Sequence, residues 1–299
     1  MRQYICIDIG GTSIKYGVLE QSGQFLTTGE MPTEAHLGGP SIMEKAKQII
    51  REFLSSYTPS GICVSTAGMV DCKKGRITYS SPLIPNYTGT EIRSILEREF
   101  QIPCEVENDV NCAGLAEYFA GAGRGSSICL CLTIGTGIGG SIIINDSVFH
   151  GFSGSGCEIG YMHLPGGSFQ DLGSSKILVE RVTQIKSLTP GNINGKWIFE
   201  HAKAGDADCI AAIDEMVDIL GMGIANICYV VNPEVVILGG GIMAQKEYLY
   251  DKLRASIDHY LLPSISKHTK LAFAQNQNQA GMLGAYYHFC HCHPELYRQ

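Results

Sequence analysis

The chain carries the same short pattern twice: a buried strand, a turn of glycine and threonine, and a strand that returns. The first copy has Asp8-Ile-Gly-Gly-Thr12 at its turn, and the second is TIGTGIGG at 133–140. A repeated supersecondary unit predicts a fold built from two related halves. A chain of 299 residues is also long for a single hydrophobic core.

The elements around these turns alternate between strands and helices. Apolar alternation predicts strands at 3–9, 14–19, 25–30, 61–68 and 104–107, with helices at 41–56, begun by a Ser41 cap, 89–99 and 110–121. The second half predicts strands at 127–135, 139–145, 148–151 and 234–240, with helices at 175–186, 196–204, 207–231 and about 280–291. This order indicates an α/β layered fold. We expect an N-terminal lobe over 1–115 and a C-terminal lobe over 116–280, with the helix at 280–299 packing back on the first.

Charge and hydropathy exclude several classes of protein. The net charge is −7, and no basic stripe of the kind that binds nucleic acid is present. No window approaches about 18 continuous apolar residues, so no membrane span is predicted. The first residues lack the features of a signal peptide, and we expect a cytoplasmic protein.

Cysteine and histidine raise the question of a metal. The chain has 12 cysteines, and most lie inside predicted apolar strands or helices, where a free cysteine acts as a small hydrophobe. The tail from His288 to His293 (HFCHCH) is rich in potential ligands but lacks a second cluster at zinc spacing. Two interpretations remain: adventitious metal binding, or an ordinary helix end and frayed terminus.

The first turn joins a carboxylate to glycines. Gly10 and Gly11 let backbone N–H groups approach a phosphate, Thr12 adds a hydroxyl and Lys15 a charge. Asp8 is suited to hold Mg²⁺ through water. The spacing is not that of a Walker A loop, and the alternative is a purely structural hairpin.

The second turn favours the functional interpretation. Gly135, Thr136, Gly137 and Gly139 repeat the pattern in the other half, as expected if a nucleotide is held in a cleft between the two lobes. A third cluster, with Gly240 and Gly241 after an apolar strand, would receive the adenosine; its alternative is a tight strand-to-helix turn.

Between the two turns lies Glu107-Asn108-Asp109-Val110-Asn111, at the end of a predicted strand and the start of a helix. Phosphoryl transfer needs a base that accepts a hydroxyl proton and groups that steady the phosphates. Asp109 fits the base and Asn108 a hydroxyl-binding amide. Taken alone, the string is more typical of a helix cap.

Together these motifs resemble the ROK (repressor, open reading frame, kinase) family of sugar kinases. The blocks occur in family order over essentially the whole chain: DIGGT, VSTAGMVD (64–71), ENDVNCAGLAE (107–117), LTIGTGIGGSI (132–142), GCEIGY (156–161), VNPEVVILGGGI (231–242) and AGMLGAYYH (280–288). The resemblance implies a two-lobe actin/hexokinase-like fold with a cleft, ATP and Mg²⁺, and phosphorylation of a sugar hydroxyl, usually the 6-OH. It also favours a homodimer.

The resemblance assigns roles by position. Asp109 matches the catalytic base and Asn108 a sugar contact. Gly68 falls where the family backs the sugar with glycine, and Ser81 lies in a stretch that contacts sugar hydroxyls. Glu158 matches a carboxylate that binds two sugar hydroxyls.

One region departs from the family. Most members have a histidine where this chain has Tyr161, followed by three cysteines that bind a structural zinc with it, but residues 161–183 contain no cysteine. We therefore expect no structural zinc; His163 alone does not make a site. The family's second sugar-binding glutamate matches Glu180 if the loop keeps its full length. We prefer a shortened loop, in which Gln170 takes its place and Ser174 or Ser175 caps the next helix.

This zinc-less variant resembles the β-glucoside kinase branch, and we expect an ATP:sugar phosphotransferase that tolerates a glucoside or disaccharide. The alternatives are a plain glucokinase or fructokinase, an N-acylmannosamine kinase, and a sugar-sensing regulator. Repressors of the family carry a helix-turn-helix domain before DIGGT, which here begins at residue 8. We therefore expect a small-molecule sugar as partner and no nucleic acid or membrane.

Overall fold

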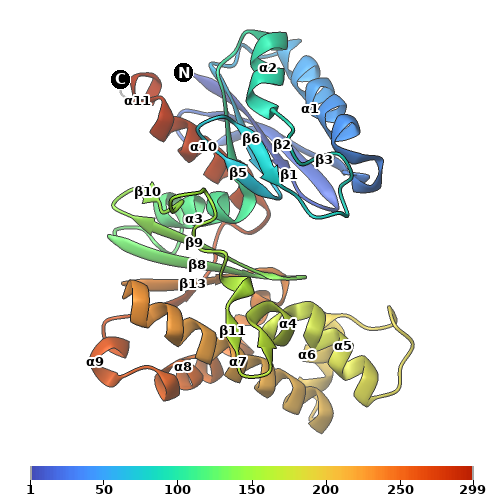
Figure 1. The fold of residues 1–299 in the computed structure, drawn as a ribbon, viewed down its shortest axis with the longest axis vertical. Coiled ribbons are helices and arrows are strands. Elements are labelled where there is room, and N and C mark those ends of the chain that lie inside the picture. The colour runs from blue at the N-terminus through green and yellow to red at the C-terminus, as the bar shows by residue number, and fades with distance from the viewer. Residues whose placement is uncertain (1, 298–299) are drawn as a thin grey trace. The chain divides into compact units, whose positions relative to one another are not determined.

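The computed structural model describes residues 2–297 and divides the chain into two compact units (Figure 1). The first spans Met1–Gly121, Ser147–Gly156 and Asn278–Gln299, and the second spans Ala122–Asp146 and Cys157–Gln277. The first unit extends past the predicted boundary at 115 because Ala116 and Ala120 pack in its core. It also takes in 147–156, which the sequence pattern places in the other half.

The first unit is built on a mixed sheet in the order β3-β2-β1-β4-β7, in which β1, β4 and β7 run parallel (Figure 1). Its strands and helices, with two short hairpin strands and a terminal turn of helix, are β1 (Gln3–Ile9), β2 (Ser13–Glu20), β3 (Phe25–Pro32), α1 (Gly38–Leu54), β4 (Gly61–Thr66), β5 (Met69–Asp71), β6 (Arg76–Tyr79), α2 (Ile92–Phe100), β7 (Cys104–Asn108), α3 (Asp109–Ala120), β10 (Ser147–Val148), α10 (Ala280–Cys292) and α11 (Pro294–Tyr297).

Alternation along β1 assigns each face of this sheet to a different pair of helices. Ile5, Ile7 and Ile9 are buried on the face that α1 and α2 cover. Tyr4 and Cys6 lie on the opposite face, in a core shared with α3 and α10. Asp8 follows the same alternation, so its carboxylate points to the α10 side.

The second unit repeats the design with strands in the order β9-β8-β13-β14, where β8, β13 and β14 are parallel. Its elements are β8 (Ile128–Ile134), β9 (Ile138–Ile144), β11 (His163–Leu164), β12 (Gly167–Ser168), α4 (Phe169–Gly173), α5 (Ser175–Ile185), α6 (Gly195–Lys203), α7 (Ala207–Val231), β13 (Val235–Gly239), α8 (Lys246–Tyr260), α9 (Pro263–Ser266) and β14 (Lys270–Phe273). Helices α4 to α8 bury one face of this sheet in a single apolar core.

Two local predictions were wrong. Helix α1 begins at Gly38, before Ser41, and no side chain caps it; the Gly39 N–H donates to the Pro85 carbonyl instead, and Pro40 occupies the first turn. The strand predicted at 148–151 is shorter and begins earlier in the structure, where β10 spans Ser147–Val148.

The interpretation of the cysteines in apolar elements is confirmed. Cys6, Cys63, Cys129, Cys131 and Cys228 are all buried and free. Between residues 2 and 297, none of the helices combines the length and the apolarity that a membrane crossing requires.

Candidate active site

Three parallel strands of the first unit end at one edge of its sheet. Register pairs Ile9 with Thr66, and Thr66 with Asn108, so the residues that follow them emerge side by side. The Gly10 turn, Gly68 and Asp109 are therefore brought together, as is usual for ligand sites in open α/β sheets.

Backbone contacts hold the first glycine turn in place. The Gly10 N–H donates to the Ser13 carbonyl (3.0 Å), and the Thr33 hydroxyl donates to the Gly10 carbonyl (2.7 Å). A Cβ on Gly11 would meet nothing within 4 Å, and Gly11 does not have a positive φ. Since the fold itself does not demand glycine there, the open space above the turn suits the approach of a ligand to the backbone.

Asp8 is half-buried between β4 and α10. Its Oδ1 accepts a hydrogen bond from the Ser65 hydroxyl (2.6 Å). A Cβ on Gly281 would lie 2.3 Å from the Asp8 carboxyl carbon, so the final helix can approach the carboxylate only through glycine. Burial raises the pKa of Asp8, opposed by the Ser65 bond and by Lys15, its partner on β2.

Asn108 caps α3 and positions Asp109 at the same time. Its Oδ1 accepts from the N–H groups of Val110 (2.9 Å) and Asn111 (3.1 Å). Its Nδ2 donates to the Gly68 carbonyl (2.9 Å) and to Asp109 Oδ1 (3.0 Å). The helix-cap interpretation of this string is confirmed for Asn108, and the same side chain also orients the Asp109 carboxylate. Asn108 can therefore bind a sugar hydroxyl only by giving up one of these four hydrogen bonds.

Asp109 has the electrostatic character of a general base that works near neutrality. Burial, followed by repulsion from Asp8, raises the pKa of Asp109 to about 7, against hydrogen bonds from Val110 and Asn108. A base is most effective when its pKa lies near the working pH.

Gly68 contacts Asn108 through its carbonyl, and Ser81 lies further along the chain in the same unit. Gly68 has φ +101°, and a Cβ there would lie 2.8 Å from the Tyr79 carbonyl, so glycine is required both by the backbone and by the chain at 79–80. Ser81 is exposed, and its Oγ accepts from the Leu83 N–H. The hydroxyls of Thr66 and Tyr87, 2.6 Å apart, are buried beneath the same edge.

In the second unit the glycine turn lies between β8 and β9. The Gly135 N–H donates to the Gly137 carbonyl, and Ser175 donates to the Gly135 carbonyl through its N–H (3.0 Å) and its Oγ (2.6 Å). Thr136 is exposed at the tip, and Gly139 follows in β9. This turn is anchored to the first residue of α5 much as the Gly10 turn is anchored to Thr33.

The third glycine cluster ends β13, the strand parallel to β8. Gly240 has φ +102°, and a Cβ there would lie 2.1 Å from the Ile134 carbonyl oxygen. Both the backbone conformation and the close contact therefore require glycine at this position. A Cβ on Gly241 would meet nothing within 4 Å. Gly239 pairs with Thr133, so both glycine turns of this unit lie at one edge of its sheet.

The candidate sugar residues of the second unit lie around a short 3-10 turn. Glu158 precedes this turn at 159–161 and is exposed, as is Tyr161, at 56%. Gln170 lies in α4, and its Oε1 would be 2.8 Å from a Cβ on Gly137 and 3.0 Å from one on Gly160. Glu180 is exposed on α5, 3.7 Å from Lys176. Gln170 thus lies beside the glycine turn and Glu180 on a helix surface, and a role of Gln170 in sugar binding stays a prediction.

The segment that replaces the family's zinc loop is regular. Residues 163–168 form a hairpin, β11–β12, turned by Pro165 and Gly166, and Ser168 caps α4 through the Asp171 N–H. The tight turn and the cap order the backbone of this segment. Ser174 lies at the cap position of α5, but its side chain makes no capping bond. His163 is exposed, and the absence of zinc from this segment stays a prediction.

Sequence reasoning missed the groups that support these residues. Ser65, Gly281, Thr33 and Ser175 each contact a predicted site residue through long-range packing. Ser65 and Gly281 lie inside motifs used for the resemblance, which was the available signal. Thr33 carries no local pattern that distinguishes it, and Ser175 was considered only as a possible helix cap.

Comparison with known proteins agrees with this geometry. The ROK family model matches residues 4–291. An uncharacterized protein of Clostridium perfringens is 52% identical, with 97% of this chain and 98% of that protein covered. A β-glucoside kinase of Listeria monocytogenes is 32% identical, with 94% and 95% covered.

Three solved structures are similar over nearly their whole length. A Listeria monocytogenes protein provisionally assigned as an N-acetylmannosamine kinase has a TM-score of 0.88 at 31% identity, covering 97% of this chain and 99% of that one. A ROK protein of Streptococcus pneumoniae in complex with sucrose has a TM-score of 0.87 at 28% identity, covering 98% and 99%.

The third is a glucokinase of Streptomyces griseus in complex with glucose and AMPPNP, with a TM-score of 0.81 at 28% identity, covering 95% and 97%. These likenesses confirm the two-lobe actin/hexokinase-like fold. With the family model spanning nearly the whole chain, they establish that this protein belongs to the ROK family.

Proposed function

We propose that this protein is an ATP-dependent kinase that phosphorylates a hydroxyl of a hexose or hexoside, the 6-OH, with Asp109 as general base. The observation that carries the proposal is the Asp109 carboxylate itself. It is held by Asn108 and Val110 at the start of α3, with a pKa raised to about 7 by burial and by Asp8.

The chemistry assigned to Asp109 is a single proton transfer. The sugar hydroxyl oxygen bonds to the γ-phosphorus as the bond to the departing ADP oxygen breaks, and the hydroxyl proton passes to Asp109. Since Oδ1 is occupied by Asn108 and Val110, Oδ2 is the oxygen assigned to receive it. The protein supplies positioning and charge rather than a covalent intermediate.

Both glycine turns are assigned to the phosphates and the third cluster to the nucleoside. The exposed backbone at Gly11 and Gly135, where an added Cβ would meet nothing, suits close approach by an anion. Asp8 fits hydrated Mg²⁺, because one of its oxygens is fixed by Ser65 and its carboxylate lies beside the turn. When bound, the ion would neutralise phosphate charge.

The substrate class is proposed from the second unit. Tyr161 replaces the family histidine, and its exposed ring offers a flat face on which a second sugar or an aryl group can stack. The β-glucoside kinase relative and the sucrose-bound neighbour support a site that accepts more than a monosaccharide. N-acylmannosamine is the second candidate, supported by the similar Listeria structure.

The test is ADP production from ATP and Mg²⁺ with a panel of glucose, fructose, mannose, N-acetylmannosamine, cellobiose and an aryl β-glucoside. Phosphorylation of at least one sugar, mapped to carbon 6 by NMR of the product, is expected. ATP turnover unaffected by every sugar would contradict the proposal.

A further inference from the structure

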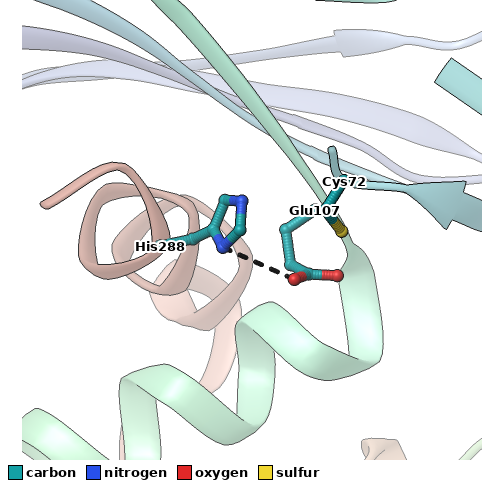
Figure 2. Close-up of side chains that lie close together, drawn as sticks. All are labelled: Cys72, Glu107 and His288. Carbon is teal, nitrogen blue, oxygen red and sulfur yellow. Dashed lines mark ion pairs between the residues drawn. The ribbon is translucent and has the colours of Figure 1, made fainter. Parts of the chain in front are cut away.

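Four side chains that commonly bind metals converge in the first unit from segments far apart in the sequence. Cys72 lies in the turn between β5 and β6, Glu107 in β7, His150 just after β10, and His288 in α10. Figure 2 shows Cys72, Glu107 and His288 pointing toward one another. The first unit therefore supplies the second ligand cluster that the C-terminal tail lacks in the sequence.

The distances between these side chains are short. His150 Nε2 lies 2.6 Å from Glu107 Oε2 and 3.5 Å from Cys72 Sγ. His288 Nδ1 lies 3.5 Å from the same Glu107 Oε2 (Figure 2). Ligand atoms of Cys72, Glu107 and His288 all fall within 4.8 Å of one another. Glu107 Oε2 is thus the common partner of both histidines.

These distances resemble the edges of a tetrahedral zinc site. Bonds of about 2.3 Å to sulfur and about 2.0–2.2 Å to nitrogen or oxygen place neighbouring ligand atoms about 3.3–3.6 Å apart. Two measured separations match this range, and the third, between His150 and Glu107, is that of a hydrogen bond. A bound metal would replace the proton that His150 and Glu107 share and would increase the distance between these two ligand atoms.

The charges in this cluster also suit a divalent cation. Glu107 is fully buried, and His288 is 6% exposed. A thiolate and a carboxylate would together neutralise a divalent ion, with both histidines as neutral ligands.

We propose that Cys72, Glu107, His150 and His288 bind one Zn²⁺ ion. One sulfur, two imidazole nitrogens and one carboxylate oxygen form a complete donor set for zinc, whereas Mg²⁺ prefers oxygen ligands alone. Cys72 and His150 are partly exposed and give the ion a route to the buried carboxylate. The site shares no residue with the 161–180 segment, where the family pattern places zinc.

A neighbouring group of Glu105, His288 and Cys292 is the rival position for the ion. There Glu105 already pairs with the Arg93 guanidinium and lies 3.0 Å from His293 Nε2. A cation held there would sit beside a fixed positive charge. His288 Nε2, 3.8 Å from Cys292 Sγ, is better placed to be oriented by this second group while Nδ1 binds the metal.

Zinc at this position would brace the start of α3. Glu107 Oε1 accepts hydrogen bonds from the Asn108 N–H (2.7 Å) and from Asn111 Nδ2 (3.0 Å), on either side of Asp109. Fixing Oε2 with a metal holds this carboxylate, and through it the strand-to-helix turn. The role is structural, so its tests do not depend on kinase activity.

The experiment uses the full chain, stripped with a chelator, dialysed and titrated with Co²⁺ and then Zn²⁺. One Co²⁺ per chain is expected, with the intense visible bands of tetrahedral cobalt and a sulfur charge-transfer band, all displaced by zinc. Cys72→Ser should remove the charge-transfer band, and His288→Gln should weaken binding at least about tenfold.

Three variants are controls. Cys157→Ser replaces a half-buried cysteine of the second unit, and His291→Gln replaces an exposed histidine of α10; both should bind as the parent does. Cys292→Ser should keep the charge-transfer band. Loss of the band in Cys292→Ser but not in Cys72→Ser would overturn the assignment.

A measurement on the unaltered zinc-loaded protein needs no variant to fold. X-ray absorption should give a first shell of one sulfur and three nitrogen or oxygen atoms. A shell with no sulfur or with two, or failure of the unaltered chain to bind a stoichiometric ion, would overturn the proposal.

Discussion

Two features of Asp109 act on its pKa in opposite directions. Burial of the carboxylate raises the pKa, and hydrogen bonds from Val110 and Asn108 lower it. Alanine at 109 removes the proposed proton acceptor and leaves the cap of α3 intact, because Asn108 supplies that cap. We expect Asp109→Ala to reduce kcat by about 10²–10⁴-fold with little change in the thermal unfolding midpoint. Near-normal turnover in the folded variant would remove Asp109 from its role.

The raised pKa of Asp109 predicts the acid side of the pH profile. The base works only when ionised, so kcat/KM should fall tenfold per pH unit as the pH drops below about 7, where this carboxyl gains its proton. A pKa raised above the unfolded value also means that ionised Asp109 costs stability, so Asp109→Asn should stabilise the fold more at pH 8 than at pH 5. An acid limb near pH 4 would contradict this environment.

The neighbour that raises this pKa is itself testable. Burial acts first, and the charge of Asp8 second. Asp8→Asn removes that charge while keeping a side chain of the same shape, so residual activity should show its acid limb at lower pH. An unchanged limb would show that burial alone sets the pKa.

Two asparagines, Asn108 and Asn194, each cap a helix. Comparing their alanine variants distinguishes the effect of a lost cap on stability from an effect on catalysis. Asn108→Ala removes the cap of α3 and the donor to Asp109, whereas Asn194→Ala removes only the cap of α6, where Asn194 Oδ1 accepts from the Trp197 N–H. Each should cost about 1 kcal/mol of stability. Only Asn108→Ala should also lower kcat, and equal kinetic effects would contradict the positioning role.

Most strands and helices of the site could be predicted because their signals are local. Alternation marks β1 and β8, and glycine marks the turns that follow them. The region 243–279 received no assignment, although α8 and β14 lie there. The start of α1 was misplaced because the Gly39 N–H donates to the carbonyl of Pro85, a residue far along the sequence, and no local pattern indicates this bond.

The candidate site was only partly predictable for the same reason. Residue types suggested Asp8 and Asp109, but their environments depend on Ser65 and Gly281. Tyr161 was identified only as a departure from a family pattern. The grouping of Cys72, Glu107, His150 and His288 arises from topology alone, because His150 joins the first unit from a segment enclosed by the second.

For the molecule as a whole, the range of sugars that it phosphorylates tests the effect of the family histidine being replaced by Tyr161 in the second unit. We expect kcat/KM for cellobiose or an aryl β-glucoside to be at least equal to that for glucose under the same ATP and Mg²⁺ conditions. The physical reason is the exposed Tyr161 ring in place of a metal-fixed imidazole. A preference for glucose above about 100-fold, or about 2.7 kcal/mol, would replace this proposal with a plain glucokinase.

A single variant tests whether Tyr161 is the cause of this substrate range. Tyr161→Ala should lower the ratio of glucoside to glucose kcat/KM, because the stacking face is lost. Tyr229→Ala, an exposed tyrosine on α7, is the matched control and should leave the ratio unchanged.

The contact between Gly281 and Asp8 has a consequence for how the protein is made. Gly281, which walls the Asp8 carboxylate, leaves the ribosome only after the whole stretch between the two residues has been synthesised. The first unit is assembled from three stretches of the chain, so its core between β1 and α10 cannot close until α10 has been synthesised. A nascent or prematurely terminated chain therefore exposes the Tyr4 and Cys6 face of its sheet to chaperones and proteases. Any premature stop before residue 280 should accordingly yield a degraded fragment rather than a half-active enzyme.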